Sequence, residues 1–147
     1  MALYALDTNV YIAAIRSDSS ATDLKRFYSA HAPRCFMLSP VLHELLVGAK
    51  TREKRRELHS DIGGPFVRTG RILTPSHQAW CASGETLARI AEEEQVDRAS
   101  FPRSFIADAI IAACCRENGV TLVTANTADF SRIARALKFN FVAPYPA

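Results

Sequence analysis

Residues 3–16 read LYALDTNVYIAAIR, a short apolar segment followed by an aspartate and then by a helical pattern. The same alternation of short extended segments and longer helical ones continues along the chain. It predicts an α/β fold in three layers, with a central, mainly parallel sheet flanked by helices. Because the carboxyl ends of parallel strands gather at one edge of such a sheet, side chains that follow the strands should meet there.

Five short apolar segments are the predicted strands, at residues 3–6, 35–38, 71–73, 120–124 and 139–142. Longer patterns predict helices over residues 8–16, 21–30, 76–95, 102–118 and 127–137, with a further helix opening at Pro40. Ser39 is the expected N-cap before Pro40, since serine caps helices well and proline suits their first position.

Other local signals mark where helices and loops should lie. Gly63-Gly64-Pro65 predicts a loop, and Asn118-Gly119 predicts a left-handed helix end. Caps for the helix over residues 21–30 are available from Ser19, Ser20 and Thr22. The buried side of the helix over residues 76–95 is expected to carry Trp80, Leu87, Ile90 and Ala91.

Length and composition predict one domain that spans residues 1–147. The chain is 48% hydrophobic and 22% charged, as in ordinary globular domains. Charged residues interrupt every apolar stretch well before the roughly 18 residues that cross a bilayer. The N-terminus also lacks a basic leader with an apolar stretch and a cleavage site. We therefore expect a soluble, cytoplasmic protein without a membrane anchor.

The cysteines do not suggest a disulfide framework or a zinc site. They show no paired CxxC spacing and lie at Cys35, Cys81, Cys114 and Cys115. Unpaired cysteine behaves mainly as a small buried hydrophobic residue, so we expect reduced structural thiols.

A basic segment follows the helix that opens at Pro40. Five cations crowd into seven residues, namely Lys50, Arg52, Lys54, Arg55 and Arg56. One interpretation is a solvated helix face with Glu53 and Glu57 as partial partners. The other is a surface for a phosphate backbone, which the mildly basic net charge of +3 permits without requiring.

Three carboxylates interrupt segments that are otherwise apolar. Asp7 follows residues 3–6, Glu44 lies within the segment 39–48, and Asp108 lies within the segment 105–113. Burying an unpaired carboxylate costs several kcal/mol or forces it to take up a proton. Their repeated placement therefore suggests that a cation occupies the space between them, as in a metal-dependent enzyme.

Each carboxylate also has a simpler explanation. Asp7 can serve as a helix N-cap, and Glu44 can lie on a partly exposed helix face.

An all-oxygen site would favour Mg²⁺ or Mn²⁺ over zinc. No recognisable ligand spacing connects the histidines, and His43 should point about 100° away from Glu44 around a helix.

Taken together, the motifs resemble the PIN domain nucleases, and more narrowly the VapC-type toxins of prokaryotic toxin–antitoxin pairs. The resemblance covers essentially the whole chain. It rests on LDTNV at residues 6–10, SPVLHEL at residues 39–45 followed by Gly48-Ala49, ADAIIAA at residues 107–113 and LVTANTADF at residues 122–130. Each motif alone is loose, whereas their order and separations are specific.

The resemblance implies that Asp7, Glu44 and Asp108 form an acidic pocket for Mg²⁺ or Mn²⁺. The fourth position is open between Asn126 and Asp129. Many family members have an acid where this chain has Asn126, while others have the asparagine and use the later acid. Charge favours Asp129, and nearness to the strand end favours Asn126.

Three polar residues would support this pocket: Thr8, Asn9 and Thr124. Their hydroxyl or amide groups would orient the ligands or phosphate oxygens. Plain capping by Thr8 or Thr124 is the alternative.

By the same resemblance, the chain would be an endoribonuclease that leaves 5′-phosphate and 3′-hydroxyl ends, with tRNA the favoured substrate. A small cognate antitoxin and a second copy of the chain in a homodimer would be its partners. The antitoxin would place an apolar helix in a groove and reach the pocket with a basic side chain.

Three other classes of protein are considered. A phosphotransfer domain also has an aspartate after its first strand, but a phosphatase of that kind usually needs a second aspartate at position 9, which is asparagine. A PIN-like domain with a degraded pocket would only bind RNA or a protein, and Asn126 favours it. A metal-free ribonuclease built on two histidines is the third.

Overall fold

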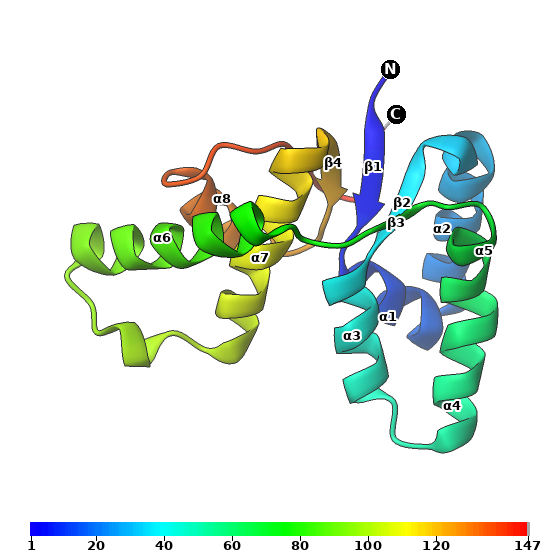
Figure 1. The fold of residues 1–147 in the computed structure, drawn as a ribbon. Helices are drawn as coiled ribbons and strands as arrows, with labels where there is room; N and C mark the ends of the chain where they lie inside the picture. The colour runs from blue at the N-terminus through cyan, green and yellow to red at the C-terminus, as the bar shows by residue number, and fades with distance from the viewer. Residues whose placement is uncertain (147) are drawn as a thin grey trace.

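Five parallel strands form the central sheet of the protein, whose computed structural model describes residues 1–146 (Figure 1). They are β1 (Leu3–Leu6), β2 (Cys35–Leu38), β3 (Ile72–Leu73), β4 (Val120–Val123) and β5 (Phe141–Val142), in the spatial order β3-β2-β1-β4-β5. Ala5 pairs with Phe36 on one side and with Leu122 on the other. The central strand is therefore β1, whose carboxyl end lies beside that of β4.

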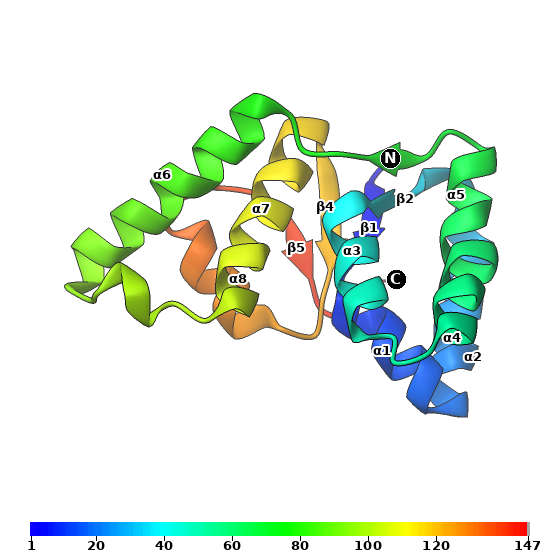
Figure 2. The same ribbon diagram turned by 60° about the horizontal axis from the view of Figure 1, so that its bottom comes forward.

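Two groups of helices flank the sheet, which confirms the predicted three-layer α/β fold (Figures 1 and 2). One group comprises α1 (Thr8–Arg16), α2 (Asp18–His31), α3 (Ser39–Gly48), α4 (Arg52–Glu57) and α5 (Gly64–Arg68). The other comprises α6 (His77–Glu94), α7 (Arg103–Asn118) and α8 (Thr127–Ala134). Short 3₁₀ turns cover Ala32–Arg34 and Arg98–Ser100. Helices α3 and α7 contact each other across the boundary between the two groups.

The core lies between the middle strands and α7. Leu6, Met37 and Leu122 from three neighbouring strands are at most 1% exposed. Most of α7 is also buried, including Phe105 and Ile111. A helix buried on nearly all sides is the least favourable place for a carboxylate, and α7 is the helix that carries Asp108.

The expected loop at Gly63-Gly64-Pro65 was wrong. A π-helix covers Leu58–Gly63, and α5 begins directly at Gly64. Both glycines have right-handed helical dihedral angles, and Pro65 lies in the first turn of α5, where a missing N–H costs little. A Cβ atom at Gly63 would lie only 3.3 Å from Leu42, so glycine here allows α3 and the π-helix to approach closely.

Several helix and strand ends differ from the predictions. Ser39 is the first residue of α3 rather than its N-cap, and its hydroxyl lies 2.7 Å from that of Thr74. Helix α2 begins at Asp18 with Ser17 as its cap. Helix α8 ends at Ala134 and β5 begins at Phe141. Such ends depend on contacts with other segments, which local patterns do not encode.

The buried side of α6 was also predicted in part wrongly. Ile90 and Ala91 are buried, but Trp80 is 57% exposed. All four cysteines are free, and Cys81 alone among them is exposed. None of the helices within residues 1–146 is both long and apolar enough to cross a membrane.

Candidate active site

Asp7 lies where β1 ends and α1 begins. It is 4% exposed and caps α1, with Oδ1 accepting a hydrogen bond of 2.8 Å from the backbone N–H of Thr8. Oδ2 accepts further hydrogen bonds from Asn9 and from the Thr124 hydroxyl. Burial raises the pKa of Asp7, and these hydrogen bonds oppose the rise. The capping interpretation of Asp7 is thus correct, but capping uses only one of its two oxygens.

Asn9 joins the end of β1 to the end of β4. Its Nδ2 donates to Asp7 Oδ2 at 3.0 Å and to Thr124 Oγ1 at 3.1 Å. Its Oδ1 accepts from the backbone N–H of Ala125 at 3.0 Å. The hydroxyl of Thr124 also accepts from the backbone N–H of Asn126 at 3.0 Å. These contacts place two of the three residues named as supporting groups, Asn9 and Thr124, beside Asp7.

Glu44 enters the site from the middle of α3. Its Oε1 atom is buried and has no hydrogen-bond partner. Burial raises the pKa of Glu44, and the Asp7 carboxylate raises it further. The side chain of Thr8, a residue only 9% exposed, lies beside Glu44 and opposes the rise in its pKa. Buried polar atoms usually have partners, so the Oε1 atom of Glu44 is available to a ligand.

Asp108 lies on α7 and is close to the carboxylates of Asp7 and Glu44. It is 7% exposed. Its pKa is raised to about 8, chiefly by burial and then by the charges of Asp7, Glu44 and Asp129. A carboxylate influences another in this way only at short range, so these four acids form one cluster.

The side-chain amide of Asn126 connects Asp108 to Asp129. Its Nδ2 donates to Asp108 Oδ2 and to Asp129 Oδ2, both at 3.2 Å. Asn126 and Asp129 are half-buried, at the end of β4 and in the first turn of α8. The structure therefore brings both candidates for the fourth position into the cluster, with the asparagine as donor and the aspartate as acceptor.

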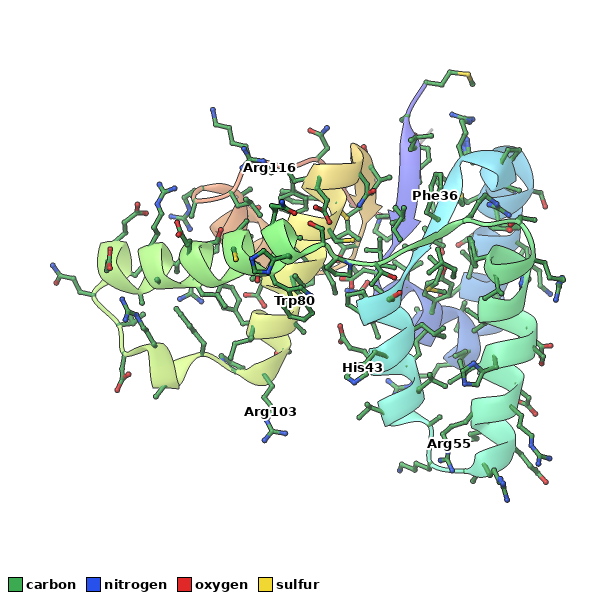
Figure 3. The ribbon with its side chains drawn as sticks, in the orientation of Figure 1. Phe36, His43, Arg55, Trp80, Arg103 and Arg116 are labelled. Carbon is green, nitrogen blue, oxygen red and sulfur yellow. The ribbon has the colours of Figure 1, made fainter. Side chains whose placement is uncertain are left out.

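The donor atoms of the cluster fit a hard divalent cation in kind. They are all oxygens, and one of them, Glu44 Oε1, is buried without a hydrogen-bond partner. Within residues 1–146, however, no three His, Cys, Asp or Glu side chains converge closely enough to hold an ion as they stand. A metal would therefore have to draw the carboxylates together. His43 is exposed on α3, and Figure 3 shows its side chain on the surface of that helix.

One contribution to this region was missed by the sequence analysis. The backbone N–H of Ala125 binds Asn9, and no side-chain pattern could signal it.

The comparisons with known proteins concern the whole chain rather than its individual site residues. The sequence model of the PIN domain matches residues 4–136. A comparison with curated proteins finds no match. Among solved structures, DNA-bound VapBC from Salmonella typhimurium is similar, with a TM-score of 0.72 and 23% identity over 97% of this chain and 98% of that chain.

Two further structures are similar over almost their whole length. FitAcB from Neisseria gonorrhoeae has a TM-score of 0.66 and 19% identity, over 95% of this chain and 96% of that chain. A toxin–antitoxin complex from Klebsiella pneumoniae has a TM-score of 0.61 and 22% identity, over 98% of this chain and 99% of that chain. At these identities, the similarity establishes a shared fold.

Proposed function

Because the chain belongs to the PIN domain family, we propose that it is a metal-dependent endoribonuclease and the toxin of a toxin–antitoxin pair. It acts in the cytoplasm, and tRNA is the favoured substrate. The observation that carries the proposal is the cluster of four carboxylates around Asp108, which come from four different elements. Such a cluster is costly for folding alone and is explained by a bound cation.

Asp7, Glu44, Asp108 and Asp129 would hold Mg²⁺ or Mn²⁺ in this proposal. A metal held by these carboxylates would supply a water of lowered pKa and would offset charge on the phosphodiester. Thr124 and Asn9 orient the Asp7 carboxylate through the hydrogen bonds to Oδ2. Asn126 orients Asp108 and Asp129 in the same way. The reaction then needs no nucleophile from the protein.

The test is cleavage of a mixed pool of tRNA and other structured RNA, with Mg²⁺ or Mn²⁺ against EDTA. The wild type is compared with Asp7→Asn and Asp108→Asn. Glu85→Gln is the matched control, because Glu85 is an exposed acid of α6, far along the chain from the cluster. We expect cleavage that needs metal, that both site variants lose and that the control retains.

A binding-only PIN domain is the second candidate function. Two observations favour it. Position 126 carries an amide in place of an acid, and within residues 1–146 no three acidic side chains converge closely enough to hold an ion. Intact RNA with every metal tested, from folded protein free of any antitoxin, would replace the nuclease with this candidate. Cleavage that survives EDTA and leaves cyclic-phosphate products would instead point to a histidine ribonuclease.

The antitoxin would dock in an apolar cavity on the α1–α2 side of the molecule. The cavity has a volume of about 310 Å³, and its lining includes Tyr11, Ile15, Leu24, Tyr28, Ile62 and Phe66. Ile15 is 62% exposed at its edge. An amphipathic helix could insert apolar side chains here and offer a polar group to the unpartnered Tyr11 hydroxyl.

Ile15→Glu tests this docking site. The charge should weaken binding of a co-encoded small protein, measured by co-purification and titration calorimetry, and leave RNA cleavage intact. Val96→Glu, at an exposed position after α6, is the control and should change neither. Equal binding by both variants would exclude the cavity. The homodimer expected for the toxin is measured separately, by analytical ultracentrifugation.

A further inference from the structure

The basic segment is a separate feature of the surface. We call residues 50–57 the basic arm; they comprise the end of the loop after α3 and all of α4. Five cations stand against two carboxylates in it, a formal charge of +3 that equals the net charge of the whole chain. Every residue of the arm is exposed.

The cations of the basic arm have no acidic partners within residues 1–146. Among those residues, the only cations that form ion pairs are Arg26, Arg89, Arg98 and Arg132, and none of them belongs to the arm. Glu53 and Glu57 accept no ion pair from the arm, so a salt-bridged helix face does not explain its charges. Within residues 1–146, Arg55 is the only one of these cations whose side chain makes a hydrogen bond, from Nη1 to the backbone oxygen of Ala49.

The arm lies close to the carboxylate cluster along α3. Gly48, the last residue of α3, is four residues beyond Glu44, or about 6 Å along the helix axis. Arg103, the first residue of α7, is five residues before Asp108, or about 7.5 Å along that axis. Figure 3 shows Arg55 and Arg103 at the same end of the molecule and Arg116 at the opposite end.

We propose that the basic arm and Arg103 bind the phosphate backbone of the RNA on the two sides of the carboxylate cluster. The identity of the polymer rests on the proposed function. Four carboxylates repel a phosphodiester, and flanking cations offset this repulsion while the strand approaches. Exposed cations without acidic partners are available to replace the counterions of a nucleic acid.

A polyanion fits this surface better than a protein does. All six residues of α4 are charged, so the arm offers no apolar or aromatic anchor of the kind that dominates protein interfaces. In Figure 1 the arm begins at the bottom of the molecule, in the loop after α3, and α4 continues directly into the π-helix and α5. The RNA would then contact the protein over several nucleotides beside the bond that is cut.

The experiment measures binding of fluorescein-labelled tRNA in EDTA, by fluorescence anisotropy at several KCl concentrations. The test variant is Arg52→Gln/Lys54→Gln/Arg56→Gln, which leaves the bonded Arg55 in place. Arg116→Gln/Arg135→Gln/Lys138→Gln removes the same charge from exposed cations elsewhere. A third variant, Arg52→Lys/Arg56→Lys, retains the charge of the arm.

For the test variant, we expect the slope of log affinity against log salt to fall by about 2, since each lost phosphate contact removes about 0.7–0.9. The affinity should drop at least tenfold at low salt. The control triple and the lysine variant should stay within about threefold of the wild type, and Arg103→Gln should lower the slope by about 1. Thermal melts confirm that all variants are folded.

Binding without metal separates this inference from the proposed function. If RNA is never cut but the arm still controls its binding, the nuclease proposal fails and the inference stands. If the arm variant binds tRNA with the affinity and slope of the wild type, the inference is overturned. Loss of antitoxin binding with unchanged RNA binding would overturn it too, and would make the arm a protein-binding surface.

Discussion

The Thr124 hydroxyl donates a 2.7 Å hydrogen bond to Asp7 Oδ2, across 117 residues of sequence. Thr124 is 0% exposed and Asp7 4% exposed, so the bond forms out of contact with water. It connects the carboxyl ends of β1 and β4, which pair in parallel. A threonine after a strand thereby orients the acid after a neighbouring strand.

Thr124→Val should lower the free energy of unfolding by about 1–3 kcal/mol, because Asp7 Oδ2 and the N–H of Asn126 both lose a partner inside the protein. Urea denaturation monitored by circular dichroism measures the change. Thr124→Ser retains the hydroxyl and should stay within about 1 kcal/mol of the wild type. A valine variant as stable as the serine variant would show that the bond contributes nothing net.

Asp108→Asn should stabilise the metal-free protein at high pH while it abolishes cleavage. The pKa of Asp108 is raised from 3.8 to about 8, chiefly by burial, so folding disfavours its charged form. The wild type then loses stability as pH rises from about 4 to about 8. The variant, which carries no charge, avoids this loss, and its advantage should reach a few kcal/mol, on the order of 1.4 per pH unit.

Urea denaturation of the wild type and Asp108→Asn in EDTA at pH 4, 6 and 8 tests whether the stability difference grows as pH rises. The two curves should nearly coincide at pH 4 and separate as pH rises. An asparagine variant that is less stable than the wild type at pH 8 would mean that the carboxylate has a structural role. Added Mn²⁺ should stabilise only the wild type.

Asn126→Asp should bind Mn²⁺ more tightly and be less stable without it. The new carboxylate would face Asp108 and Asp129, which now accept hydrogen bonds from the amide. Like charges at this range raise one another's pKa and favour a bound cation. Calorimetry gives the affinity, and thermal melts in EDTA give the stability.

Asp129→Asn is the matched variant for the fourth position. If Asp129 supplies the fourth donor, this change should weaken Mn²⁺ binding more than Asn126→Ala does. The opposite order would assign that position to the amide oxygen of Asn126. Equal affinity in all of these variants would exclude both residues from the metal site.

Arg71→Ala should destabilise the protein by about 2–4 kcal/mol without affecting metal binding. Its Nη1 donates to the backbone oxygens of Ala32 and Cys35, and its Nη2 donates to the Tyr28 hydroxyl at 2.9 Å. The guanidinium also lies 5.2 Å from the ring centre of Phe66. Removing it breaks these hydrogen bonds and the cation–π contact.

The same urea measurement applies, with Arg68→Ala as a control at an exposed position of α5. Arg71→Lys should recover only part of the loss, because an ammonium group lacks the planar fork that reaches several acceptors. Full recovery by lysine would show that the charge alone matters.

The sequence by itself determined the five strands and the main helices in their order along the chain, and both limits of three of them. Leu3–Leu6, Cys35–Leu38 and Thr8–Arg16 appear as predicted, because short apolar runs and helical periodicity act over a few residues. It also identified Asp7, Glu44 and Asp108, because a charge within an apolar segment is visible without coordinates. Asp129 came only from the family resemblance, with Asn126 as its alternative. Family membership followed from the same motifs and their separations.

Only the tertiary structure decided how those residues meet. Asn126 donates to Asp108 on another helix, and Asn9 binds a backbone N–H 116 residues away. Packing also exposed Trp80 and turned the expected loop at Gly63 into a helix that approaches Leu42. Contacts of this kind depend on which surfaces the fold brings together, and local sequence carries no record of them because the partners lie far apart in the chain.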